Sequence, residues 1–269
     1  MSNTGTVVAL RRYPVKSMLG EDLKTAVLTS AGLRGDREVA AIDCATGNVA
    51  TAKHPKLWRG LLGLAARWNA GSPVITLPDG STVAVDDPAA DKTLSGLLGR
   101  EIRLSRTRPA GAVVGRPDPE DVIADGDDAD VPYRTLEIGL GTPGTNFVDY
   151  APVHLVTTAT LARVGTEMIR YRPTLVLDLA GSLAFAENDW TDREITIGDT
   201  RLLVISPTPR CAVPTLAHGD LPRRTEAVRT LLEHNRIPLP GSGPAPCLGA
   251  YAQVLTPGSI SLGDQASVA

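Results

Sequence analysis

A chain of 269 residues is long enough to bury a substantial hydrophobic core, in one large domain or two smaller ones. Hydrophobic residues (42%) and charged residues (21%) lie slightly below globular averages, which excludes wholesale disorder. The formal net charge of −3 carries no signal for nucleic acid or an anionic membrane as a partner. Glycine (26) and proline (21) are enriched, which favours short elements joined by turns.

The cysteines and the N-terminus indicate a reducing compartment. Cys44, Cys211 and Cys247 are too widely spaced for a disulfide framework, and their odd number leaves one thiol unpaired. Residues 1–10 lack the basic and apolar regions of a signal peptide, and no apolar run approaches about 18 residues. We therefore expect a soluble, cytoplasmic protein with no membrane partner and no nucleic-acid partner.

The first hundred residues predict short strands separated by turns. The β-rich runs cover residues 6–10, 26–28 and 38–43. Residues 74–77 and 81–85 flank Pro78-Asp79-Gly80 and predict a hairpin, because an Asp-Gly pair fits a tight turn between strands. Asp87 is expected to cap a helix that ends at Leu98.

The stretch after this helix changes character. Seven acidic residues lie between Asp118 and Asp130, with no basic residue among them. Such acids repel one another and do not build a core, so residues 109–131 are expected to form a solvated linker or loop. A loop that docks a partner protein is the alternative.

Alternating patterns then resume. Predicted strands cover residues 152–156, 174–179, 201–205, 250–255 and 259–262. Predicted helices cover 159–169, capped by Thr157 or Thr158, and 222–235. Many short strands without regular alternation with helices predict a mostly β, α+β fold, with β-barrel-like parts and a few covering helices.

Cys211 is the strongest candidate for chemistry. It follows Thr208-Pro209-Arg210 at the end of a predicted apolar strand. A neighbouring guanidinium favours the thiolate, which is the form that acts as a nucleophile or binds soft metals. The alternative from the residues alone is a small buried hydrophobic side chain, the commonest role of a free cysteine.

Three cationic segments could hold an anion. Lys16 and Ser17 lie beside a turn and offer a charge and a hydroxyl, which suits a phosphate. Arg37 precedes a predicted strand, and Arg170 and Arg172 lie at a predicted helix-to-strand junction. Taken one at a time, each segment is better explained by solvated surface cations.

The histidines show no spacing typical of metal ligands. His154, on an apolar strand, fits a hydrogen-bonded core residue. His218, seven residues after Cys211, leaves open a Cys/His catalytic pair as a minor alternative. The sequence has no Walker motif, no GxGxxG after a strand and no HExxH.

Taken together and in order, several segments resemble the MOSC family, the domain shared by molybdenum-cofactor sulfurase C-termini and the mitochondrial amidoxime-reducing component. Three segments resemble the N-terminal β-barrel domain of that group: YPVKSMLGEDL (13–23), GLRGDREVAAID (32–43) and TAKHPKL (51–57). MOSC proper resembles DYAPVHLVTTATLARV (149–164), RYRPTLVLD (170–178), FAENDWTDREITIGDTRLLVISPTPRCAVPT (185–215) and LGAYAQVLTPGSISLGDQASV (248–268).

The resemblance implies a MOSC-associated N-terminal β-barrel domain over residues 1–108, an acidic linker or loop over 109–131, and a MOSC domain over 132–269. It also implies a bound molybdenum cofactor (Mo-molybdopterin), with Cys211 as the catalytic residue and the molybdenum ligand. The cofactor-binding residues that it implies are Lys16, Ser17, Arg37, Arg172, Thr174 and Arg210. Thr174 stands where the family has asparagine, and Pro209 stiffens the turn before Arg210.

The implied activity is that of an oxidoreductase. It would reduce N-hydroxylated or related N-oxygenated small molecules, or S-oxides, with electrons from an external flavin or iron–sulfur protein. Two alternatives remain open on the same scaffold. One is a molybdenum-independent, cysteine-based sulfur-transfer or carbon–sulfur lyase enzyme, and the other is a non-catalytic carrier of the molybdenum cofactor.

Overall fold

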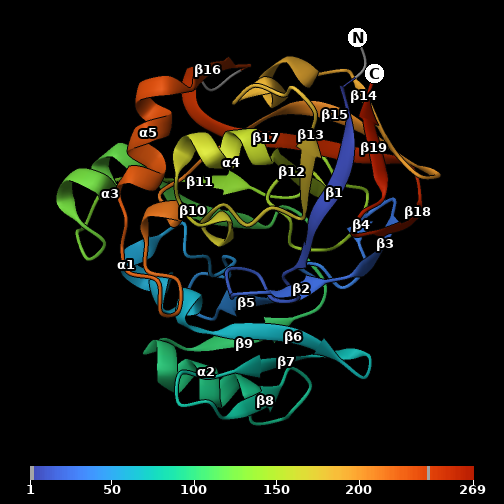
Figure 1. Ribbon diagram of the computed structural model, residues 1–269. Helices are drawn as coiled ribbons and strands as arrows, with labels where there is room; N and C mark the ends of the chain where they lie inside the picture. The colour runs from blue at the N-terminus through green and yellow to red at the C-terminus, as the bar shows by residue number, and fades with distance from the viewer. Residues whose placement is uncertain (1–2, 241–242) are drawn as a thin grey trace.

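The computed structural model describes residues 3–240 and 243–269, and its main feature is a closed β-barrel (Figure 1). Around the barrel, the described strands are β12 (Val153–Thr157), β13 (Leu175–Leu179), β1 (Asn3–Arg12), β19 (Gln265–Val268), β14 (Glu194–Ile197), β15 (Thr200–Pro209) and β17 (Gly243–Thr256). β17 pairs with β12 and so closes the ring. The predicted mostly β, α+β fold is confirmed.

Apolar side chains from alternate strand positions fill the barrel, since neighbouring residues of a strand point to opposite faces. Val7, Leu177 and Leu202 are among the fully buried residues of this core. β12 and β13 are parallel, so their connection crosses over through α4 (Thr158–Val164) and η2 (Met168–Arg170).

Thr157 begins α4, because its side chain accepts a hydrogen bond from the Thr160 N–H. Gly165, in the left-handed conformation, ends the helix earlier than the predicted Ile169.

Small sheets complete the N-terminal part. β3 (Thr25–Thr29) pairs with β4 (Gly32–Leu33) and β18 (Gly258–Ser261), and β5 (Ala40–Asp43) pairs with β9 (Ile102–Ser105). β6 (Ala65–Asn69), β7 (Ser72–Thr76) and β8 (Thr82–Ala84) form a meander at the bottom of Figure 1. α1 (Pro55–Trp58), η1 (Arg59–Gly63) and α2 (Ala90–Leu98) pack with them.

The predicted hairpin is therefore present as β7 and β8. Its following helix begins later than expected, at Ala90. The Asp87 side chain accepts from the Ala89 N–H, and so it caps a turn that precedes α2.

Strands from the two parts of the sequence share sheets. β1 pairs with β13 and β19, while β3 pairs with β18. Residues 3–33 therefore lie in sheets with strands beyond residue 174, across the sequence division expected near residue 108. β2 (Glu21–Leu23) lies at the edge of β1, and β16 (Arg236–Leu239) lies at the edge of β17.

The acidic segment, expected to be a solvated linker or loop, contains regular structure. β10 (Val113–Pro117) pairs with β11 (Tyr133–Glu137), and α3 (Pro119–Asp125) lies between them. Basic residues from elsewhere in the chain form ion pairs with four of its seven acids, in the pairs Glu120–Arg236, Asp127–Arg223, Asp128–Arg59 and Asp130–Lys56. Val114 and Val122 are buried, so this segment packs as part of the fold.

The remaining elements of the described chain are η3 (Ala186–Trp190), η4 (Val213–Thr215) and α5 (Glu226–His234), the last shorter than the predicted 222–235. Among them, η3 packs against β15 and β17, α5 packs against β17, and η4 contacts α5. Among the residues that the structure describes, no helix is long and apolar enough to cross a membrane.

Candidate functional site

One narrow cavity of about 60 Å³ collects every cofactor-binding and metal-binding residue that the family resemblance implied. Its lining includes Lys16, Ser17, Arg37, Arg172, Thr174, Arg210 and Cys211. These residues lie up to 195 positions apart in the chain and meet because β1, β13 and β15 belong to one barrel. Arg170 does not line this cavity, because its guanidinium donates to the carbonyls of Leu216 and Pro222.

Lys16 and Ser17 lie in the turn that follows β1. The Lys16 N–H donates to the Val39 carbonyl (2.8 Å), which ties this turn to the segment before β5. The Ser17 hydroxyl contacts the Thr51 hydroxyl (3.1 Å) and accepts from the Ala52 N–H (3.1 Å). Both side chains are held at a buried junction of two loops.

Arg37 and Arg172 lie against the buried ring of Tyr13. Their guanidinium carbons are 4.9 Å and 4.2 Å from its centroid, within cation–π range. Arg37 Nη2 donates to the Arg172 carbonyl (3.2 Å), and Arg172 Nη1 donates to the Met18 carbonyl (2.7 Å). The aromatic ring thus holds two like charges side by side.

Thr174 lies immediately before β13, where its N–H donates to the His154 carbonyl (2.8 Å). His154 is buried between the carbonyls of Arg172 (Nδ1, 3.5 Å) and Leu248 (Nε2, 3.2 Å). The expectation of a hydrogen-bonded core histidine is confirmed.

Arg210 and Cys211 follow the end of β15. Arg210 donates from its backbone N–H to the Pro246 carbonyl (2.7 Å) and from Nη2 to the Tyr171 carbonyl (2.8 Å). Cys211 is a free thiol, 7% exposed, that packs with apolar neighbours such as Leu62 and Leu216. It is therefore both a buried side chain and part of the cavity lining.

Three polar atoms of this lining have no hydrogen-bond partner within the described chain, although each is buried. They are Arg172 Nη2, Thr174 Oγ1 and Arg210 Nε. Buried polar groups are nearly always satisfied, because an orphaned donor loses its hydration without compensation. Unpartnered atoms of three lining residues indicate a site that supplies donors to a ligand.

The ionisation of the site reflects burial first and neighbouring positive charges second. Burial lowers the pKa of Lys16 to about 8, although the nearby Asp149 carboxylate raises it. Burial, assisted by the charge of Arg37, lowers the pKa of Arg172 to about 10. Burial also lowers the pKa of His154 to about 3, so this imidazole is neutral at pH 7. A bound anion would relieve the repulsion among the cations.

The backbone of the site is unusual as well. Ser17 (φ 65°), Arg37 (φ 50°) and Arg172 (φ 55°) adopt the left-handed conformation that favours glycine. Within the described residues, they are three of the six non-glycine positions with positive φ. Backbone strain of this kind persists where the surrounding structure enforces it, and it clusters at functional sites.

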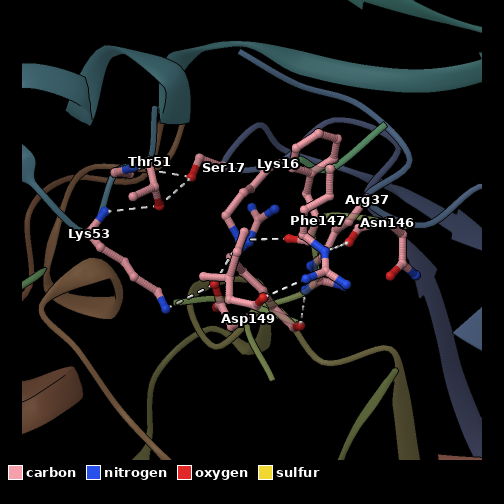
Figure 2. A network of polar contacts seen from close by, with 12 residues as sticks. Lys16, Ser17, Arg37, Thr51, Lys53, Asn146, Phe147 and Asp149 are labelled. Atoms are coloured by element: carbon pink, nitrogen blue, oxygen red, sulfur yellow. Dashed lines mark hydrogen bonds and ion pairs between the residues drawn. The ribbon is translucent and has the colours of Figure 1, made fainter. Parts of the chain in front are cut away.

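Sequence reasoning missed two charged residues of the site. The Asp149 carboxylate accepts from Lys16 Nζ (2.7 Å) and lies 2.9 Å from Lys53 Nζ, as Figure 2 shows. Burial tends to raise the pKa of Asp149, but the two lysines lower it well below its usual value. Both residues lie within the segments that resemble the MOSC family, which was the available signal. Lys16 Nζ also donates to the Phe147 carbonyl (2.7 Å).

A second, wider cavity of about 650 Å³ adjoins the first. Cys211, Arg210, Lys53, Asp149 and Tyr251 line both. Arg116 lies in the wider cavity, where its Nη2 donates to the Arg210 carbonyl (3.2 Å). His218 lines neither of the two, so the structure does not support a Cys211–His218 pair.

Two family descriptions match the chain. The MOSC N-terminal beta barrel domain matches residues 4–105, and the MOSC domain matches residues 143–267. The chain belongs to the MOSC family. MOSC domains are associated with proteins that bind the molybdenum cofactor.

Similarity to individual proteins is weak. No curated protein matches the chain. Among solved structures, the YUAD protein from Bacillus subtilis is 11% identical with a TM-score of 0.45, covering 100% of this chain and 97% of its own. YiiM from Geobacillus stearothermophilus is 15% identical with a TM-score of 0.30, covering 61% of this MOSC chain and 75% of its own.

Proposed function

We propose that this MOSC protein binds the molybdenum cofactor through the residues of the narrow cavity, which is large enough for the phosphate end of the cofactor, and works as an oxidoreductase on N-hydroxylated or related N-oxygenated small molecules, or S-oxides. The observation that carries the proposal is the set of buried, unpartnered donors beside Cys211. Arg172 Nη2, Arg210 Nε and Thr174 Oγ1 offer hydrogen bonds that the described protein leaves unused.

The residues present fit such a cofactor. A phosphate is a multiple acceptor of hydrogen bonds, and the cations Lys16, Arg37 and Arg172 give it charge-assisted donors in a buried setting. A soft metal prefers a thiolate, which Cys211 supplies from the same cavity. Thr174 provides a hydroxyl where the family has an amide, so a donor remains at that position.

The protein's own residues would bind the cofactor and orient the substrate. When bound, the cofactor supplies a two-electron centre for removing oxygen from the substrate. Lys16, Arg37 and Arg172 would hold its anionic end, and Cys211 would hold the metal. Asp149 fixes the ammonium groups of Lys16 and Lys53 at the junction of the two cavities. Lys53 lines both cavities together with Cys211 and would offer an N–H donor to the substrate there.

Turnover separates this function from the cofactor carrier. We expect the molybdenum-loaded protein to reduce an N-hydroxylated compound to its amine or amidine when an artificial electron donor is supplied. A carrier would hold stoichiometric molybdenum and show no reduction. A cysteine-based sulfur-transfer or lyase enzyme would act on sulfur substrates with no metal bound.

Each cation of the site should contribute separately to the affinity for the cofactor. We expect Lys16→Ala and Arg37→Ala each to lower cofactor affinity roughly 10- to 100-fold, because each removes a charge-assisted contact worth about 1.5–3 kcal/mol. The measurement is pterin and molybdenum content after repeated gel filtration, with thermal unfolding to verify the fold.

The matched controls are exposed cations that line neither cavity, Lys24→Ala and Arg103→Ala. Arg116 is unsuitable as a control because it contacts the Arg210 carbonyl. Equal retention in the Lys16, Arg37 and control variants would place the cofactor elsewhere.

Phosphate binding should weaken at alkaline pH. The pKa of Lys16 is about 8 in the free protein, and a bound dianion favours the ammonium form. The complex therefore keeps a proton that the free protein loses above pH 8. Affinity should fall by up to about tenfold per pH unit above about pH 8.

Calorimetric titration with inorganic phosphate tests this pH dependence. Asp149, with its pKa held well below the usual value, and Arg37, with its pKa raised despite burial by Asp36, should keep their ionisation through this range. Lys16→Arg should flatten the profile between about pH 8 and 9, since a guanidinium stays charged there. An unchanged decline in the arginine variant would assign the titration to another group.

A further inference from the structure

Cys211 lines two cavities whose walls differ in chemical character. The narrow cavity is lined by Lys16, Arg37 and Arg172, whereas the wide one is walled mainly by aliphatic, proline and tyrosine side chains. Cys211 lies at the seam where the two cavities meet, and Asp149 and Lys53 also line both cavities. A molecule in the wide cavity can therefore reach Cys211 without entering the cationic cavity.

The walls of the wide cavity come from two separate parts of the fold. One wall is the β10–β11 strand pair and the loop after it, with Leu136 and Leu140. The other wall is the end of β15 and the edge strand β16, with Ile205 and Ile237. Backbone hydrogen bonds from Gly139 to Asp149 (3.0 Å) and from Gly141 to Tyr150 (3.0 Å) fix the Leu140 loop beside the seam.

Two large side chains that line the wide cavity are exposed to solvent. Leu140 is 65% exposed and Tyr150 is 42% exposed, and both line this cavity. A volume of about 650 Å³ lies within the usual range of small-molecule sites, about 300–1,000 Å³, which combine apolar walls with a few polar groups. Three of its polar residues, Asp149, Lys53 and Arg210, line both cavities together with Cys211.

We propose that the wide cavity binds the apolar body of the substrate, so that this protein acts on N-oxygenated compounds that carry an extended hydrocarbon or aromatic group. The inference rests on the proposed function in one respect only, namely that the reacting group of the substrate is an N-oxygenated group. Leu140 and Ile237 are then specificity-determining residues, one on each wall. They contact the substrate tail and lie outside the cationic cavity.

Binding of unreactive analogues tests the inference without turnover. The probes are neutral straight-chain carboxamides of increasing tail length, which contain no N–O bond, and ligand-observed NMR measures their Kd. We expect Kd to fall about three- to fourfold for each added methylene, the factor for burying one CH₂ group, until the tail fills the cavity. A Kd independent of tail length would overturn the proposal.

Two variants assign the effect to the cavity. Leu140→Ser and Ile237→Ser should each flatten the dependence on tail length and leave molybdenum content unchanged. Leu183→Ser is the matched control, since Leu183 is 78% exposed and lines neither cavity. The same tail dependence in all three variants would place tail binding elsewhere and overturn the proposal. If the Kd falls with tail length and the two cavity variants abolish this effect, tail binding in the wide cavity is supported. This result would hold even if the protein contained no molybdenum, an outcome that would contradict the proposed function alone.

Discussion

Replacing Cys211 with serine should remove bound molybdenum from the protein and leave the fold intact. A hydroxyl is a poor ligand for a soft metal, while the change in side-chain volume is small. Loss of even an outer partner of a metal ligand costs roughly 10- to 100-fold in metal affinity, so loss of the ligand itself should exceed that range. Metal content by elemental analysis and thermal unfolding of the same preparation give the two readouts.

The other cysteines serve as controls of different burial. Cys247 is fully buried, lines neither cavity, and has its thiol pKa raised to about 11 by burial, so it remains protonated at neutral pH. Cys44 is exposed. Cys247→Ser and Cys44→Ser should both keep wild-type molybdenum content. Full metal content and activity in Cys211→Ser would end its assignment as the ligand.

Electron supply should depend completely on a second protein or a chemical donor. Reduction of an N-hydroxylated compound consumes two electrons and two protons and releases water, so the centre must be reduced again in each cycle. The three cysteines of the chain are too few for a four-cysteine iron–sulfur cluster, and no dinucleotide fingerprint is present. We therefore expect no measurable turnover with NADH alone.

Activity should appear when a chemical reductant, or a flavin or iron–sulfur partner protein, is added to the same loaded preparation. The comparison uses one batch of protein, with product formation followed by chromatography. Sustained reduction driven by NADH with the isolated chain would contradict the need for a partner. The Cys211→Ser variant, assayed with the chemical donor, measures the background.

Local patterns in the sequence were sufficient for many elements but not for the acidic segment. The hairpin of β7 and β8 follows from an Asp-Gly turn between apolar runs. The acids near Asp127 suggested a solvated linker because their partners, such as Arg223, lie far along the chain. Long-range ion pairs of this kind become visible only once the fold brings the charges together.

The candidate site shows the same limit. Family segments pointed to Lys16, Arg172 and Cys211, which the barrel then brings to one cavity. Asp149 gave no separate signal, because its role depends on the two lysines that flank it in space. The left-handed backbone of Ser17 was equally hidden, since non-glycine residues rarely adopt it and no local pattern marks it.

Molybdenum analysis of wild-type protein, produced in a molybdenum-replete host, tests the central claim most directly. The buried donors and the thiol of the narrow cavity predict about one molybdenum per chain, accompanied by a pterin that is released on denaturation. Folded protein that contains neither molybdenum nor pterin would contradict the account, and it would favour cysteine-based sulfur chemistry at Cys211 instead.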